Sequence, residues 1–223
     1  MPMAESELAK SFERMAEHAV CDDCEEHRTP SSKPEPKKWS LICPASYRDT
    51  DPNRLNQDAL RQASEWKYGA EGIGMIGPSA VGKTRILYHV LKRHHDTGRS
   101  VVACTGTEFA LKVADIDRRV EFLHDCTEAG ILFLDDFDKA KFTERVEADL
   151  MHVVETRTSR KKPIFFAINA DGSDLEAMLS ENRGGPIVRR LREFCSVLVV
   201  KPIPKPARQN FGRLPSSSPR LRQ

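Results

Sequence analysis

The chain has 223 residues, of which 39% are hydrophobic and 30% charged, and its formal net charge is +2. This composition is typical of one globular domain with extensions and a hydrophobic core. No apolar run reaches the ~18 residues of a membrane span, and residues 1–10 lack the apolar stretch of a signal peptide. We therefore expect a cytoplasmic protein with no membrane partner, whose six cysteines are thiols or metal ligands.

Residues 1–43 are expected to form a small module that docks on a partner protein. Residues 5–20 have the spacing of an amphipathic helix whose apolar face carries Leu8, Phe12, Met15 and Ala19. A C-x₂-C pair follows, and such a pair is a common half of a structural zinc site, which needs four ligands. Free surface thiols are the alternative interpretation. The predicted Zn²⁺ ligands are Cys21, Cys24, His27 and Cys43, with His18 as an alternative to His27.

A glycine-containing stretch from Gly77 to Thr84 has the G-x-x-x-x-G-K-[ST] spacing of a P-loop. An apolar strand at 73–76 precedes it and helical periodicity follows it, which argues against a chance match. The glycines let backbone N–H groups approach phosphate oxygens, Lys83 adds a positive charge, and the Thr84 hydroxyl is placed to hold Mg²⁺. The predicted nucleotide ligands are Gly77, Pro78, Ser79, Ala80, Val81, Gly82, Lys83 and Thr84.

Further helices and a second strand flank this motif. A helix before it is marked by Leu55, Ala59, Ala63 and Trp66, and residues 100–105 form a second buried strand. Thr107 is predicted to cap one continuous helix. Its inward face carries Phe109, Val113, Ile116, Val120 and Leu123. Cys104 and Cys126 are expected to lie in packed structure.

An apolar run at 131–134 ends in paired acids, Asp135 and Asp136. Such a strand delivers carboxylates to the carboxyl edge of a sheet, where ligands bind in open α/β folds. In P-loop NTPases an acid here holds the Mg²⁺ shell, and its neighbour can orient or deprotonate the attacking water. The alternative is that the two acids only start a turn. The position of the pair, about 50 residues after a P-loop, argues against this alternative.

The remaining elements bring two more polar features. Thr143 is predicted to cap a helix, and the buried strand 164–168 ends in Asn169, which can reach a γ-phosphate or its water or can simply start a turn. Pro186 begins a helix, 187–194, that carries Arg189, Arg190 and Arg192. A fifth strand at 196–200 is followed by a tail with six basic residues and no acid, which suggests either a nearby polyanion or a solvated arm. We expect residues 204–223 to be disordered.

Five strands alternating with helices predict an α/β domain with a parallel sheet in a three-layer sandwich, over residues 44–203. The order GPSAVGKT, LFLDDF, AINA and PIVRRLREFC resembles the AAA+ ATPases of the replicative-helicase loader group, which includes helper ATPases of insertion-sequence transposition. The segment 43–49, with a proline and then tyrosine-arginine, resembles the start of that domain. The resemblance covers about residues 44–200 and implies an AAA+ type P-loop fold without a full helical lid.

By matching positions, the resemblance implies that Asp135 is the Mg²⁺-associated acid and Asp136 the water-activating one. Asn169 matches the first sensor residue, and Arg190 best matches the arginine finger that enters a neighbouring subunit's site. The alternative for the three arginines is a solvated basic face, which could contact DNA. The family further implies ATP hydrolysis, nucleotide-dependent homo-oligomers, contact with single-stranded DNA and a replicative helicase or other DNA-processing protein as the partner.

Three other functions stay open on the sequence. A transposase could replace the helicase as the partner, although the cysteine-containing extension favours the helicase. A small-molecule kinase also uses a P-loop, but the acid pair and the late arginine-rich helix argue against it. The third is a nucleotide switch that does not hydrolyse ATP. Measuring ATPase activity with and without single-stranded DNA separates these functions.

Overall fold

The computed structural model describes residues 37–169, 172–180 and 182–202. The expected helix at 5–20, the C-x₂-C pair with His27, and the basic tail therefore lie outside the described residues, and the domain limits at 43/44 and 203/204 stay predictions. None of the helices in the described part of the chain has the length and apolar character that a membrane crossing requires.

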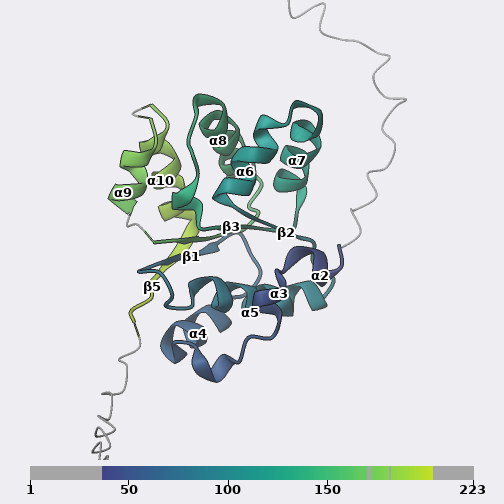
Figure 1. Ribbon diagram of the computed structural model, residues 1–223, viewed down its shortest axis with the longest axis vertical. Coiled ribbons are helices and arrows are strands. Elements are labelled where there is room, and N and C mark those ends of the chain that lie inside the picture. Colours follow the sequence, from purple (N-terminus) through teal and green to yellow (C-terminus); the bar gives the residue numbers. More distant parts are fainter. Residues whose placement is uncertain (1–36, 170–171, 181, 203–223) are drawn as a thin grey trace, which may run out of the picture. The chain divides into compact units, whose positions relative to one another are not determined.

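Five parallel strands form one sheet, as the alternating pattern predicts (Figure 1). The strand order is β2-β3-β4-β1-β5. Every residue of β3 and β4 is buried, because helices cover both faces of a parallel sheet and leave no strand face for water. The strands are β1 (Gly72–Ile76), β2 (Val101–Thr105), β3 (Ile131–Asp135), β4 (Ile164–Ile168) and β5 (Cys195–Val199).

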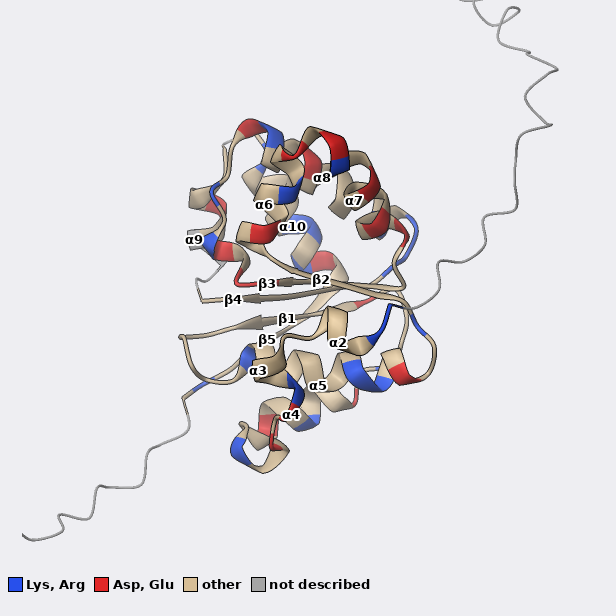
Figure 2. Cartoon of the chain, turned by 45° about the vertical axis from the view of Figure 1, so that its right-hand side comes forward, with Lys and Arg blue, Asp and Glu red and all other residues tan. Residues whose placement is uncertain are grey.

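Helices cover the two faces of the sheet in separate layers (Figure 1). One face packs against α2 (Trp39–Ile42), α3 (Ala45–Arg48), the 3₁₀ turn η1 (Pro52–Arg54), α4 (Gln57–Ser64) and α5 (Lys83–Asp96). The other packs against α6 (Gly106–Ala114), α7 (Ile116–Glu128), α8 (Glu144–Ser159), α9 (Gly172–Met178) and α10 (Gly184–Phe194). The three-layer α/β fold is confirmed, with the charged side chains on helices and loops (Figure 2), apart from Asp135 at the end of β3.

The chain reverses its direction across the sheet at the edge strand β2. It leaves β1 through α5 on one face and reaches β2 at the far edge, and it then returns through β3 and β4 by helices on the other face. Because crossovers between parallel strands are right-handed, a reversed direction places the connecting helices on the opposite face. The neighbouring strands β1 and β4 therefore lead to opposite faces, which opens a crevice at their carboxyl ends.

The segment between β2 and β3 differs from the prediction. Thr105, not Thr107, caps α6, through a capping box in which Thr105 Oγ1 accepts from the Glu108 N–H and Glu108 Oε2 accepts from the Thr105 N–H. Asp115 is extended and separates α6 from α7, which resets the helical phase. The periodicity counted from α6 therefore fails beyond the break, and Ile116 and Val120 are exposed rather than buried.

A fully buried arginine ties the starts of β3 and β4 together. Arg157 of α8 donates hydrogen bonds to the carbonyl oxygens of Cys126 (2.7 Å), Ala129 (2.9 Å) and Pro163 (2.7 Å). Burial lowers the pKa of Arg157 to about 10. Since β3 and β4 carry Asp135 and Asn169 at their other ends, this contact fixes the relative positions of two strands that build the crevice.

Candidate nucleotide-binding site

The P-loop follows β1 and Asn169 follows β4, so the register of these two strands places them side by side. Ile76 and Ile168, the last residues of the two strands, are paired. The Ser79 hydroxyl donates to Asn169 Oδ1 at 3.2 Å across the crevice. The predicted P-loop and the predicted strand-end amide are therefore parts of one site.

The backbone of the loop adopts conformations that favour glycine. Gly77 and Gly82 have φ values of 150° and 95°, and Ala80 has 65°. A Cβ on Gly77 would lie 2.3 Å from the Val200 carbonyl oxygen, so no larger residue fits there. This close approach occurs because the Val200 N–H donates to the Ile76 carbonyl, which continues the pairing of β5 with β1.

Lys83 lies inside the loop and is only 5% exposed. Its Nζ donates to the carbonyl oxygens of Gly77 (2.7 Å) and Pro78 (2.8 Å) and to Asn169 Oδ1 (2.9 Å). Burial lowers the pKa of Lys83, while the nearby acid side chains oppose that shift. The loop thus holds an ammonium group and the first turn of α5 at the place where a P-loop receives phosphate.

Thr84 and Asp135 provide a pair of hard oxygen donors beside the lysine. The Thr84 hydroxyl donates to Asp135 Oδ1 at 2.8 Å, and Asp135 is 5% exposed. Burial raises the pKa of the Asp135 carboxyl to about 6, against the opposing effect of the Thr84 hydrogen bond. Hydroxyl and carboxylate oxygens suit Mg²⁺, so the donor set fits the ion that the P-loop implies. These two residues would hold it, and the ion would supply positive charge to the phosphates.

Asp136 adopts a left-handed backbone conformation, with φ 44° and ψ 41°, which is uncommon for a residue other than glycine. Its carboxylate consequently has different partners from that of Asp135. Its Oδ2 accepts from Lys139 Nζ at 2.6 Å, and its Oδ1 accepts from Asn169 Nδ2 at 3.3 Å. The two neighbouring acids therefore have different partners, whereas their catalytic roles stay predictions.

Asp138, which no sequence motif singled out, contacts Asn169 directly. Asp138 lies on the 3₁₀ turn η2 (Phe137–Lys139), and its Oδ2 accepts from the Asn169 N–H at 3.2 Å and from Asn169 Nδ2 at 3.3 Å. The sequence signal was available, because Asp138 follows the acid pair by two residues. It does not belong to the family pattern from which the roles were taken, however, and only the structure shows its contact.

A cavity of about 970 Å³ opens beside the loop. This is at the upper end of the volumes that small-molecule sites have. Its wall opposite the P-loop comes from the segment 46–55, where Tyr47 stacks on Tyr88 with ring centroids 5.5 Å apart and Arg85 lies 5.2 Å from the Tyr47 ring. The segment that resembles the start of the family domain thus lines the site.

Arg190 has a partner within its own chain. Leu191 and Phe194 have the spacing of a buried stripe, which predicts that Arg190 beside them points outward. Its side chain is instead about a third exposed, and its Nη2 donates to Glu155 Oε1 of α8 at 3.0 Å. The reason is that α10 packs along α8, so the flank of α10 faces another helix. Arg189, at 70% exposure, lies next to Glu193. The role of Arg190 in a neighbouring site stays a prediction.

Cys43 is the one predicted zinc ligand that the structure describes. It is buried at 1% exposure in the core beneath the sheet, together with Ile42, and burial raises the pKa of its thiol. Among the described residues no cluster of three potential metal ligands occurs. The structure therefore gives no support to Cys43 as a ligand, while Cys21, Cys24 and His27 lie outside the described residues.

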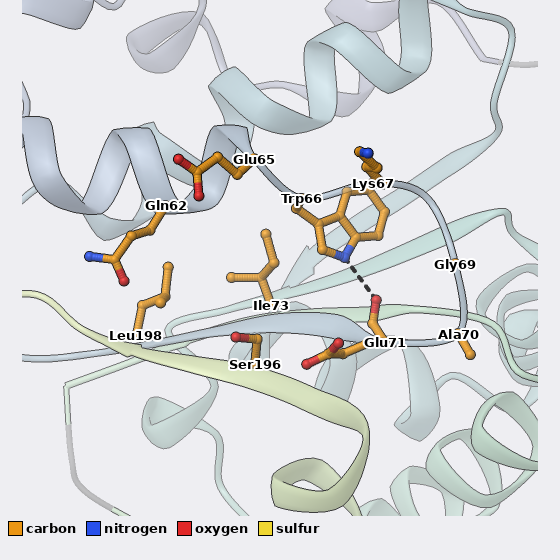
Figure 3. A pocket seen from close by; sticks show the side chains of 10 residues that line it. All are labelled: Gln62, Glu65, Trp66, Lys67, Gly69, Ala70, Glu71, Ile73, Ser196 and Leu198. Atoms are coloured by element: carbon orange, nitrogen blue, oxygen red, sulfur yellow. Dashed lines mark hydrogen bonds between the residues drawn. The ribbon is translucent and has the colours of Figure 1, made fainter.

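A second pocket, of about 460 Å³, lies at the other end of β1 (Figure 3). It is formed where the end of α4 and the following loop meet β5, and the Trp66 indole N–H donates to the Glu71 carbonyl at 2.8 Å beside it. The pocket contains none of the predicted phosphate or metal ligands. Since the P-loop and acid pair lie at the carboxyl ends of the strands, the larger cavity is the candidate site.

The five-stranded parallel α/β fold with a P-loop after β1, which the resemblance implied, is shared with solved structures of DNA-replication proteins. The sequence matches no protein-family model, and a search of curated proteins returns no match.

Solved structures with this fold include DnaI, with a TM-score of 0.61 and 17% identity over 71% of this chain and 95% of that one. The DnaC helicase loader has a TM-score of 0.56 and 17% identity over 74% of this chain and 99% of that one. The replication initiator DnaA bound to AMPPCP and single-stranded DNA has a TM-score of 0.55 and 20% identity over 68% and 47% of the two chains. At these identities the likeness establishes the fold.

Proposed function

We propose that the protein binds Mg·ATP in the cavity beside the P-loop and hydrolyses it to ADP and phosphate. One observation carries this proposal: hydrogen bonds link the ends of three strands into a single set, with Lys83 after β1, Asp136 after β3 and Asn169 after β4. A loop that only turned the chain would not need a buried ammonium group facing a carboxylate and an amide. The AMPPCP in a DnaA structure of the same fold supports a nucleoside triphosphate as the ligand.

In this proposal the residues of the site have separate tasks. The loop N–H groups and Lys83 bind the β- and γ-phosphates, and Thr84 and Asp135 hold Mg²⁺, which adds positive charge there. Asp136 accepts the proton of the attacking water, and the Asn169 amide positions that water or the γ-phosphate. Charge on the transferred phosphoryl group is stabilised mainly by positioned cations, because the protein forms no covalent bond in this reaction.

We further propose that ATP turnover serves the loading or remodelling of a replicative helicase on single-stranded DNA. The support is the fold shared with DnaC, which is described as a helicase loader, and with a DnaA structure that contains single-stranded DNA. ATPase activity measured with and without single-stranded DNA tests the first part. A pull-down of the tagged chain from its host, read by mass spectrometry, identifies the partner, and recovery of a transposase instead of a helicase would refute the assignment.

Arg190 is proposed to complete the site of a neighbouring subunit, which requires that it exchange its contact with Glu155 for one with the γ-phosphate. A mixing experiment tests this. Arg190→Ala protein has an intact P-loop and Lys83→Ala protein has an intact arginine, so each alone should be nearly inactive and the mixture should regain part of the ATPase activity. If the mixture regains no ATPase activity although both variants fold and associate, Arg190 is only a surface charge. Arg189→Ala, at a more exposed position on the same helix, is the matched control.

A further inference from the structure

The Asn169 side chain is held at both ends by groups of opposite kind. Its Oδ1 accepts from Lys83 Nζ at 2.9 Å and from the Ser79 hydroxyl at 3.2 Å, both on the P-loop side. Its Nδ2 donates to Asp136 Oδ1 and to Asp138 Oδ2, each at 3.3 Å, on the β3 side. An amide can rotate by half a turn and exchange these two ends, so the surrounding donors and acceptors decide which end faces the phosphates.

Asp138 differs from the other three partners because it also holds the backbone of Asn169. Its Oδ2 accepts from the Asn169 backbone N–H at 3.2 Å, so one carboxylate oxygen fixes both the main chain and the side chain. The turn that presents it is anchored by Phe137, which is 1% exposed. Neither Asp136 nor Lys83 has such a backbone contact with Asn169.

The other oxygen of this carboxylate does not contribute to the stability of the fold. Among the described residues, Asp138 Oδ1 is buried and has no hydrogen-bond partner. A buried acceptor without a donor is costly, and for a charged group more so. Stability alone therefore does not account for a buried acceptor side chain at this position.

We propose that Asp138 is a positioning residue for ATP hydrolysis, which holds the Asn169 amide with its oxygen toward the P-loop and its nitrogen beside Asp136. This inference rests on the proposed ATPase function and adds a residue to it. When phosphates bind, Lys83 transfers its donors to them, and three of the four contacts to the Asn169 side chain can then change. The contact with Asp138 persists, and it keeps an N–H donor between the water-activating carboxylate and the γ-phosphate position.

A double-mutant cycle tests whether Asp138 acts through Asn169. Because misplacement of a positioning group commonly costs about 10- to 100-fold in rate, Asp138→Ala should lower kcat by that factor while the Kd for ATP stays within about twofold. Asp138→Asn, which keeps a carbonyl acceptor, should retain most of the activity. The variant that combines Asp138→Ala with Asn169→Ala should be no slower than Asn169→Ala alone.

Two kinetic results would overturn the inference: full activity of Asp138→Ala, or a double variant slowed by the product of the two single effects. A second measurement does not depend on activity. The side-chain amide resonances of Asn169, identified by their loss in Asn169→Ala, should move toward the values of solvent-exposed amides in Asp138→Ala. Resonances that stay unchanged would refute the contact, whereas a wild-type protein without ATPase activity but with shifted resonances would refute only the proposed function.

Discussion

Replacing Arg157 with methionine keeps the apolar stem of this fully buried side chain and removes its guanidinium. The change leaves the carbonyl oxygens of Cys126, Ala129 and Pro163 without the donors that lie 2.7–2.9 Å away. These carbonyls lie just before β3 and β4. The substitution therefore weakens the connection between two central strands without touching the nucleotide site.

The size of the effect follows from two opposing contributions. Each buried acceptor that is left without a donor costs about 1–3 kcal/mol, which gives roughly 2–6 kcal/mol for Cys126 and Ala129. The Pro163 carbonyl still accepts from the Leu132 N–H at 3.4 Å. Removing the buried charge offsets part of this loss of stability, because burial disfavours the charged form of Arg157 and lowers its pKa. We expect a net loss of about 3 kcal/mol in the free energy of unfolding, in line with the cost of breaking other buried charged networks.

Thermal and urea unfolding followed by circular dichroism measure this loss. For a chain of this size about 3 kcal/mol corresponds to a fall in Tm of roughly 6–12 °C. Arg160→Met, at the C-cap of the same helix, is the matched control, because Arg160 is half exposed and pairs with Glu128 at the surface. It should change stability by less than about 1 kcal/mol. Equal stability of the two variants would refute the structural role given to Arg157.

Three further outcomes are expected. Asp136→Asn keeps the shape of the side chain but removes its basic oxygen, so ATP should still bind while steady-state turnover falls by about 10²-fold or more, and normal turnover would reassign the base. Gly77→Ala should weaken ATP binding at least tenfold because its Cβ meets a carbonyl oxygen at 2.3 Å, whereas Gly69→Ala, with 3.8 Å to its nearest neighbour, should not. Elemental analysis should find about one zinc per chain, and less in Cys21→Ser; metal-free wild-type protein with an ordered N-terminal segment would end the zinc hypothesis.

The parts of the fold that could be predicted are those that depend on residues close together in the sequence. The apolar runs of β1, β3 and β4 specify their own burial, and the P-loop between β1 and α5 is confined to eight consecutive residues, Gly77 to Thr84. The cap of α8 at Thr143 was likewise predicted and is confirmed. In each case the residues that define the element are neighbours in the chain.

Features that depend on distant contacts were not predictable in the same way. The apolar residues keep a helical spacing in the sequence on both sides of Asp115. The helix itself breaks there, and Ile116 and Val120 are therefore exposed and not buried. Arg190 faces Glu155 because α10 packs on α8, which the sequence of α10 alone does not encode. The contact between Asp138 and Asn169 joins residues 31 positions apart, and it arises only once β3 and β4 are paired.

Isothermal titration calorimetry of Mg·ATP against the wild-type protein and Lys83→Ala tests the central claim most directly. Lys83 is buried in the loop and contacts Asn169, so its loss should weaken ATP binding by at least tenfold, or about 1.4 kcal/mol. Lys92→Ala, on the exposed surface of the same helix, should bind ATP like the wild type. Binding of equal affinity to all three proteins, or no binding to the wild type, would contradict the assignment of the P-loop as an ATP site.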